Sequence, residues 1–136
     1  MRIVDVEKIK EAVSKAVITA NTQLPADVLE GLQKARDLET VPRARRLLEI
    51  ILENARQAQE EGMPLCQDTG LVTVHIELGQ EVHLDGGNVY QAINQGVREG
   101  YKAGYFRASM VKDPLNRINT GDNTPAIVHL ELTDGE

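Results

Sequence analysis

The spacing of apolar residues changes at Gly62, and this change restricts the possible folds of the 136-residue chain more than any other feature. Before Gly62, apolar side chains recur every three or four residues, which is the period of an amphipathic α-helix. After Gly62, they alternate with polar residues over short runs, as in half-buried β-strands. The pattern therefore predicts an α+β fold, with a helical part at 1–62 and a mixed α/β part at 63–136.

Three helices are predicted in the helical part. The first covers residues 6–20, the second follows Pro25 and includes 28–35, and the third runs from 41 or 42 to 61 with Gly62 as its stop. Because the connections between them are short, we expect an antiparallel helical layer.

The mixed part is predicted to contain strands at 71–78, 82–84 and 126–132, and one further helix that begins after Asn88. The fold class is thus an N-terminal antiparallel helical layer followed by part of a small β-sheet with one further helix. Val-His-Ile-Glu-Leu at 74–78 is similar to Val-His-Leu-Glu-Leu at 128–132, which fits either a diverged repeat or two strands with one buried face each. Since two or three strands form a marginal sheet, we expect the chain to be part of a longer chain or of a complex.

Charge and composition exclude several classes of function. The net charge is -6 and aromatic residues make up 3%, so neither phosphate contacts nor base stacking favours binding to nucleic acid. No apolar run approaches the roughly 18 residues of a membrane-spanning helix. The first six residues become polar too soon for a signal peptide, and we therefore expect a cytoplasmic protein.

The single cysteine, Cys66, cannot form an internal disulfide and cannot supply a zinc or iron–sulfur site alone. It lies in a polar loop at 62–70 between a predicted helix and a strand, where site residues are often placed. Gln67, Asp68 and Thr69 add an amide, a carboxylate and a hydroxyl. The alternative is a tight turn in which Asp68 and Thr69 bond to local N–H groups and Cys66 packs as a small hydrophobic residue.

A second polar stretch, at 107–125, gathers three cations in an otherwise acidic chain: Arg107, Lys112 and Arg117. Such a loop suits a small anion, because arginine can bind a carboxylate through two parallel hydrogen bonds. The alternative is a solvated loop with consecutive turns at 119–123 and with its cations bonded to nearby carboxylates.

Three histidines, His75, His83 and His129, lie on the polar faces of predicted strands. A histidine in such a place is more often solvated or paired than a metal ligand. The Asp-Gly-Gly segment at 85–87 lacks the lysine and the spacing of a phosphate-binding loop, so it is interpreted as a turn.

Together, the two polar loops resemble the N-terminal region of the iron–sulfur hydro-lyases, which are the class I fumarases and the L(+)-tartrate dehydratases. The residues that carry the resemblance are Pro-Leu-Cys-Gln-Asp-Thr-Gly at 64–70, Arg-Ala-Ser at 107–109, and Asp-Pro-Leu-Asn-Arg-Ile-Asn-Thr-Gly-Asp-Asn-Thr-Pro-Ala at 113–126. The resemblance covers the whole chain. It implies a 4Fe–4S cluster held by three cysteines, with one open iron that acts as a Lewis acid.

The resemblance also implies roles for individual residues in the first loop. Cys66 matches the first cluster ligand. Gln67 matches a residue beside the substrate, and Asp68 or Thr69 is a candidate for proton transfer next to the carbon that loses water.

In the second loop, Arg107 matches an arginine that binds a substrate carboxylate. The resemblance assigns four further residues to a loop that forms the substrate pocket: Asn119, Thr120, Gly121 and Asp122. The two other cysteine ligands of the family are absent, as is a glycine-rich segment that accompanies them further along the chain.

The 136 residues are therefore expected to be a partial N-terminal domain of the α subunit or α domain, inactive alone. Their expected partners are a dicarboxylate substrate, the remainder of the α domain, and a β subunit or C-terminal domain, in a homodimer or an α2β2 assembly. The expected reaction is the reversible hydration of fumarate to malate, a step of the tricarboxylic acid cycle. The alternatives are a segment of an L(+)-tartrate dehydratase α subunit and a non-catalytic assembly module.

Overall fold

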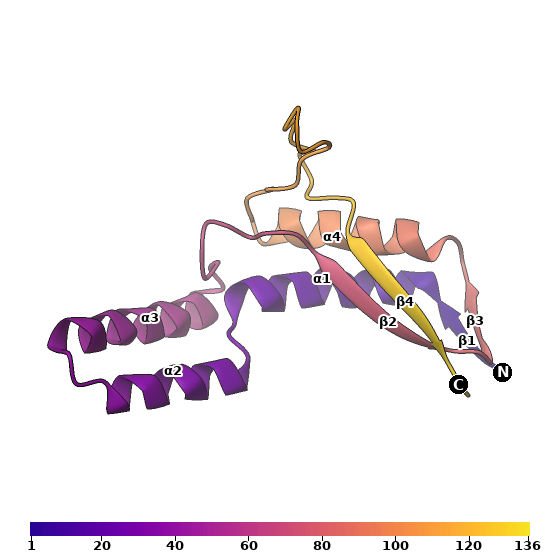
Figure 1. Ribbon diagram of the computed structural model, residues 1–136. Helices are drawn as coiled ribbons and strands as arrows, with labels where there is room; N and C mark the ends of the chain where they lie inside the picture. Colours follow the sequence, from indigo (N-terminus) through magenta and orange to yellow (C-terminus); the bar gives the residue numbers. More distant parts are fainter. The chain divides into compact units, whose positions relative to one another are not determined.

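The computed structural model describes all 136 residues, and Figure 1 shows the order of its elements. The helices are α1 (Val6–Thr22), α2 (Ala26–Leu38), α3 (Pro42–Glu61) and α4 (Val89–Ala103), and the strands are β1 (Arg2–Asp5), β2 (Thr73–Gly79), β3 (Val82–Asp85) and β4 (Ile127–Thr133). These elements confirm the α+β class. None of the helices combines the length and the apolar character needed to cross a membrane. The chain divides into two compact units, one of Met1–Ile18 with Asp68–Glu136 and the other of Thr19–Gln67.

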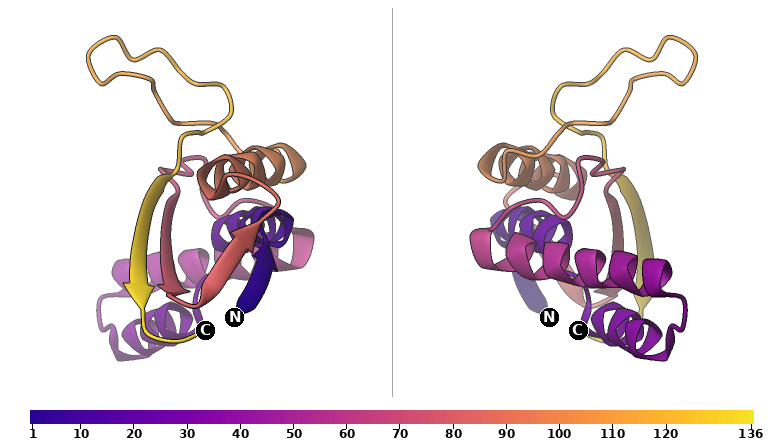
Figure 2. Two further views of the ribbon diagram at one scale, coloured as in Figure 1. Left: turned by 90° about the vertical axis from the view of Figure 1, so that its right-hand side faces the viewer. Right: turned by 90° about the vertical axis from the view of Figure 1, so that its left-hand side faces the viewer.

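The unit Thr19–Gln67 is built around a helical hairpin of α2 and α3 (Figure 2). Pro42 occupies the first turn of α3, where its missing N–H costs no helical hydrogen bond. The helix ends at Gly62, whose φ of 66° is a left-handed conformation that favours glycine, and the N–H groups of Gly62 and Met63 both donate to the carbonyl of Ala58. The short connection at 39–41 makes α2 and α3 antiparallel, as the sequence predicts for two of the three helices of the expected layer. Residues 6–18 of the third, α1, belong to the other unit.

In the other unit, residues 6–18 of α1 pack closely against α4. A Cβ atom added at Gly96 would lie 2.5 Å from the carbonyl oxygen of Lys10, so only glycine lets the two backbones approach this closely. The core beside this contact consists of Val17, Val97, Tyr101 and Phe106. The rings of Tyr101 and Phe106 meet edge to face with their centroids 5.8 Å apart. The predicted cap of α4 is confirmed, because the Asn88 side chain accepts a hydrogen bond from the N–H of Gln91.

Substituting Gly96 by alanine is expected to lower the free energy of unfolding by about 1–3 kcal/mol, since the added methyl group forces α1 and α4 apart. Gly31→Ala in α2 is the matched control. Gly31 has no atom within 4 Å of an added Cβ, and this change should raise the free energy of unfolding by about 0.5–1 kcal/mol. Urea titration of the full chain measures both. Equal effects of the two substitutions would show that the close contact is absent.

The strands form two separate parallel pairs. β1 pairs with β3, and β2 pairs with β4 in a register that places Thr73 opposite Ile127 and Gly79 opposite Thr133. The two similar pentapeptides, 74–78 and 128–132, therefore lie side by side residue for residue, and the rings of His75 and His129 stack at 4.8 Å. β1 was not predicted, because four residues are too few for alternation to be recognised.

Candidate functional site

The loop between α3 and β2 is anchored immediately before Cys66. The N–H of Leu65 donates to the carbonyl of Asn21 at 2.8 Å, and its carbonyl accepts a hydrogen bond from Asn54 Nδ2 at 3.0 Å. Cys66 and Gln67 follow and are exposed, and the Cys66 thiol is free. Cys66 therefore does not pack as a small hydrophobic residue. Its thiol is presented to solvent from a backbone that is held in place.

The donor set around Cys66 fits one ligand position of a cluster but does not complete one. No group of three or more His, Cys, Asp or Glu side chains is arranged to hold a metal ion. An exposed thiolate is a suitable ligand for iron, and an iron–sulfur cluster requires several. These 136 residues thus contain one cysteine that could bind iron and not a complete set of cluster ligands.

Asp68 and Thr69, at the start of the next segment, make different contacts. Asp68 Oδ1 accepts a hydrogen bond from the N–H of Gly70 at 3.1 Å, which closes the local turn proposed as the alternative. Thr69 instead reaches across the unit, because its Oγ1 donates to the carbonyl oxygen of Arg107 at 2.6 Å. The hydroxyl of Tyr101 donates to the carbonyl of Thr69 at 3.2 Å. The two predicted loops are therefore in direct contact at Thr69 and Arg107.

Asn123 makes a second connection between the loops. Its side chain is almost fully buried, with 1% of the residue exposed. Its Oδ1 accepts hydrogen bonds from the N–H groups of Ser109 and Met110, both at 2.8 Å, and its Nδ2 donates to the carbonyl of Gly70 at 3.2 Å. One amide side chain thus holds three backbone groups from two loops.

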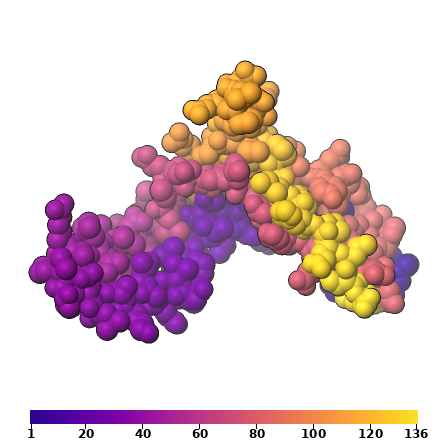
Figure 3. All heavy atoms as spheres, viewed as in Figure 1, coloured from indigo at the N-terminus to yellow at the C-terminus, as the bar shows by residue number.

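The stretch 107–125 contains the consecutive turns that the sequence suggests. Asn119 Nδ2 donates to the carbonyl of Ala108 at 2.8 Å, while its Oδ1 accepts from the N–H of Gly121 at 2.6 Å. The N–H of Thr120 donates to the carbonyl of Met110 at 2.9 Å. These bonds tie the two ends of the stretch together, and its middle projects from the unit (Figure 3).

The three cations of this stretch are exposed, and none of them forms an ion pair with a carboxylate of the chain: Arg107, Lys112 and Arg117. The ion-paired alternative for these residues is therefore wrong. Leu115, at the tip, is 90% exposed. Unpaired guanidinium and ammonium groups remain available for an anion from solution.

One face of α4 supports both loops. Asn94 Oδ1 accepts a hydrogen bond from the N–H of Ala126 at 2.8 Å, and Arg98 Nη1 lies 3.6 Å from Asp122 Oδ2. Tyr101, which bonds to the first loop, follows on the same face, because residues at i, i+4 and i+7 align on a helix. One helix therefore contacts both loops and links them to each other.

Asp122 has an internal structural role in addition to the pairing with Arg98. Its Oδ1 accepts hydrogen bonds from the N–H of Thr124 at 3.1 Å and from Thr124 Oγ1 at 2.7 Å. Partial burial raises the pKa of the Asp122 carboxyl, but these hydrogen bonds and the Arg98 charge outweigh it, so the pKa lies below its usual value. Asp122 consequently stays ionised to a lower pH than a free aspartate.

The structure brings together only part of the predicted site. Asp68 and Thr69 share one compact unit with the stretch 107–125, and Thr69 bonds directly to Arg107. Cys66 and Gln67 belong to the other compact unit, although Asp68 follows Gln67 directly in the chain.

Four residues that contact the two loops through hydrogen bonds or an ion pair were not singled out from the sequence: Asn94, Arg98, Tyr101 and Asn123. The first three form a polar stripe at helical spacing, which is a signal that the sequence does contain. Asn123 has no such signal, since it stands among other turn-forming residues and its burial depends on segments distant in the chain.

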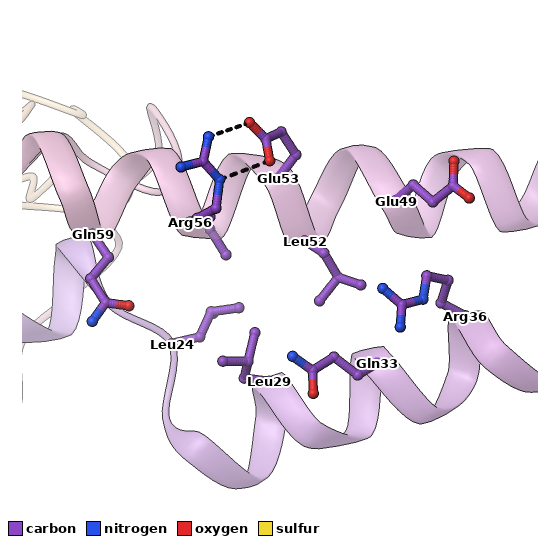
Figure 4. Close-up of a pocket in the computed structure, with 10 residues that line it drawn as sticks. Leu24, Leu29, Gln33, Arg36, Glu49, Leu52, Glu53, Arg56 and Gln59 are labelled. Atoms are coloured by element: carbon purple, nitrogen blue, oxygen red, sulfur yellow. Dashed lines mark hydrogen bonds and ion pairs between the residues drawn. The ribbon is translucent and has the colours of Figure 1, made fainter.

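A cavity of about 370 Å³ lies between α2 and α3 (Figure 4). Its centre is apolar, and polar side chains stand around it. Arg56 is already paired there with Glu53, and hydrogen bonds from Arg56 and Gln57 lower the pKa of the Glu53 carboxyl to about 2. None of the predicted site residues lines this cavity.

Comparison with known proteins gives a consistent family. A family model described as Fumarate hydratase (Fumerase) matches residues 10–136. A protein of Geobacillus stearothermophilus, provisionally named a class I fumarate hydratase, is 34% identical over 118 residues, covering 86% of this chain and 22% of the relative. A protein of Methanocaldococcus jannaschii, provisionally named an L(+)-tartrate dehydratase subunit alpha, is 31% identical, covering 88% of this chain and 44% of the relative.

The L(+)-tartrate dehydratase subunit alpha of Escherichia coli K12 is 28% identical over 119 residues, covering 88% of this chain and 39% of the relative. The chain thus spans less than half the length of each of these curated relatives. The family match covers nearly all of the chain, including both polar loops. The chain belongs to the fumarate hydratase (Fumerase) family.

Proposed function

We propose that this chain is the partial N-terminal α domain of a hydro-lyase that reversibly hydrates fumarate to malate. The observation that carries the proposal is the 2.6 Å hydrogen bond from Thr69 Oγ1 to the carbonyl of Arg107. It places the loop with a candidate acid–base group beside the loop with unpaired cations. Family membership supports the reaction class.

The second loop supplies the attraction for a dicarboxylate. The chain is acidic overall, with a net charge of -6, so a dianion needs local positive charge to bind. Arg107 is exposed and unpaired, and its guanidinium can hold a carboxylate in a fixed orientation. The other proposed substrate-binding residues are Gln67, Asn119, Thr120, Gly121 and Asp122.

Of the two candidates for proton transfer, Asp68 is favoured. The Thr69 hydroxyl donates a hydrogen bond to the carbonyl of Arg107, which suits a role in positioning the two loops. Asp68 accepts the hydrogen bond from the Gly70 N–H through Oδ1, so Oδ2 is available for a weakly acidic C–H proton. Asp68 therefore acts as the acid–base group.

Cys66 is proposed as one of three thiolate ligands of a 4Fe–4S cluster, and the two other cysteines lie outside these 136 residues. When bound, such a cluster with one open iron supplies Lewis-acid polarisation of the substrate hydroxyl. The exposure of the Cys66 thiol supports this role.

The complete cytoplasmic enzyme is proposed to contain the remainder of the α domain with a β subunit or C-terminal domain, in a homodimer or α2β2 assembly. Relatives that are named subunit alpha support a second subunit. L(+)-tartrate dehydration is the second candidate reaction, and the names of the same relatives favour it. Initial rates of the complete enzyme with fumarate, malate and L(+)-tartrate test both, and no turnover of any of the three would refute the proposal.

Arg107→Gln in the complete enzyme is expected to raise the KM for the dicarboxylate about 10- to 100-fold, because a hydrogen bond to a charged group contributes about 1.5–3 kcal/mol. Steady-state kinetics measure the change. Arg43→Gln is the matched control, since Arg43 is an exposed arginine of α3 and should leave the KM unchanged. Equal KM values for both variants would show that Arg107 does not bind the substrate.

A further inference from the structure

We propose that Asn123 is the positioning residue that holds Asp68 and Arg107 in their productive arrangement. This inference rests on the proposed hydro-lyase function and adds a residue that the family resemblance does not assign. Asn123 touches neither of the two groups directly. It acts through the backbone segments that carry them.

The side chain of Asn123 has two separate arms. Its Oδ1 accepts hydrogen bonds from the N–H groups of Ser109 and Met110, which follow Arg107 by two and three residues. Its Nδ2 donates to the carbonyl of Gly70, two residues after Asp68. The acceptor arm therefore fixes the substrate-binding segment, and the donor arm fixes the segment with the acid–base group.

Asparagine suits this position for three reasons. Its amide carries both an acceptor and a donor, which neither aspartate nor leucine of similar size provides. Its backbone φ of 59° is left-handed, a conformation that asparagine tolerates better than most residues. With 1% of the residue exposed, water cannot replace the three hydrogen bonds, so removing them leaves the buried backbone groups without partners at their full cost in free energy.

Asn123→Asp separates the two arms. The substituted carboxylate keeps the acceptor arm, but its second oxygen faces the carbonyl of Gly70 and repels it. We expect kcat to fall about 10- to 100-fold at alkaline pH, with KM nearly unchanged, because a small displacement of a reacting group costs up to about 100-fold in rate. At acidic pH the carboxyl becomes protonated and donates to the Gly70 carbonyl, so the kcat ratio of variant to wild type should rise.

Asn123→Gly removes both arms and keeps a residue that tolerates positive φ. We expect kcat to fall and KM to rise, with no recovery at acidic pH. A merely structural role would instead lower the active fraction in both variants, leave KM unchanged in both, and give no pH-dependent recovery. That result would overturn the proposal, as would wild-type kinetics in Asn123→Asp at all pH values.

Asn116→Gly is the matched control for Asn123→Gly. It makes the same substitution at an exposed asparagine of the same stretch, adds no negative charge beside Arg117, and should leave kcat and KM unchanged. Hydrogen exchange of the Ser109 and Met110 amides gives a readout that does not need activity, and it should become faster in Asn123→Gly. Unchanged exchange would show that Asn123 does not hold this segment and would refute the proposal. If the wild-type enzyme is inactive but exchange is still faster in Asn123→Gly, the proposed function is refuted, and Asn123 holds the two loops together only structurally.

Discussion

Replacing Cys66 by alanine is expected to remove bound iron from the complete enzyme and to lower its hydro-lyase activity by more than about 100-fold. Even outer-shell partners of a metal site contribute about 10- to 100-fold, and a direct ligand contributes more. Cys66 is the only cysteine among these 136 residues, so no other residue of this segment can replace it as a thiolate ligand. Because the residue is exposed, its truncation should not disturb the packing. Iron and sulfide content per chain, with initial rates, measure the effect.

Met63→Ala is a suitable control for Cys66→Ala. Met63 lies in the same loop and is 55% exposed, but it has no proposed ligand role. Iron content and activity should remain at the wild-type level. Wild-type iron content and activity in Cys66→Ala would instead identify Cys66 as an inert thiol and favour the assembly-module alternative.

Asp68→Asn is expected to lower kcat by about 10²- to 10⁴-fold, which is the usual contribution of a general acid–base group. The substitution preserves the local turn, because the asparagine Oδ1 can still accept the hydrogen bond from the N–H of Gly70. KM should change little, since the substrate-binding cations are untouched. The exchange of the transferred proton of malate with solvent deuterium gives a second measurement, and it should slow in parallel with kcat.

Asp5→Asn provides the matched control for Asp68→Asn. Asp5 Oδ1 also accepts a hydrogen bond from a backbone N–H two residues further on, that of Glu7, but it lies at the end of β1. The control should keep the kcat of the wild type. A similar kcat for Asp68→Asn and wild type would exclude Asp68 as the acid–base group and leave Thr69 as the remaining candidate for proton transfer.

The helices and most strands were predictable because their signals are local. α2 and α3 show apolar periodicity together with Pro42 and Gly62 at the ends of α3, and the structure places these elements as expected. The partner of α1 was less accessible to prediction. Residues 6–18 of α1 pack with α4, because Gly96 and Gly100 allow the two backbones to approach closely. A glycine in a helix does not by itself indicate which other helix packs against it.

The candidate site was predictable as two loops but not as one arrangement. The residue types in each loop indicate a thiolate, a carboxylate and anion-binding cations. That Arg107, Lys112 and Arg117 are unpaired, and that Cys66 is exposed, could not be read from the sequence, since pairing and burial depend on the surrounding chain.

The sequence by itself determined the change from helical to strand period at Gly62, the α+β class and the residue types of both loops. Only the tertiary structure decided which segments meet. Thr69 bonds to a residue 38 positions away, and Asn123 bonds to Gly70 across 53 positions. Periodicity and turn preferences describe a few neighbouring residues, whereas these hydrogen bonds join segments that are distant in the sequence and lie together only in the folded chain.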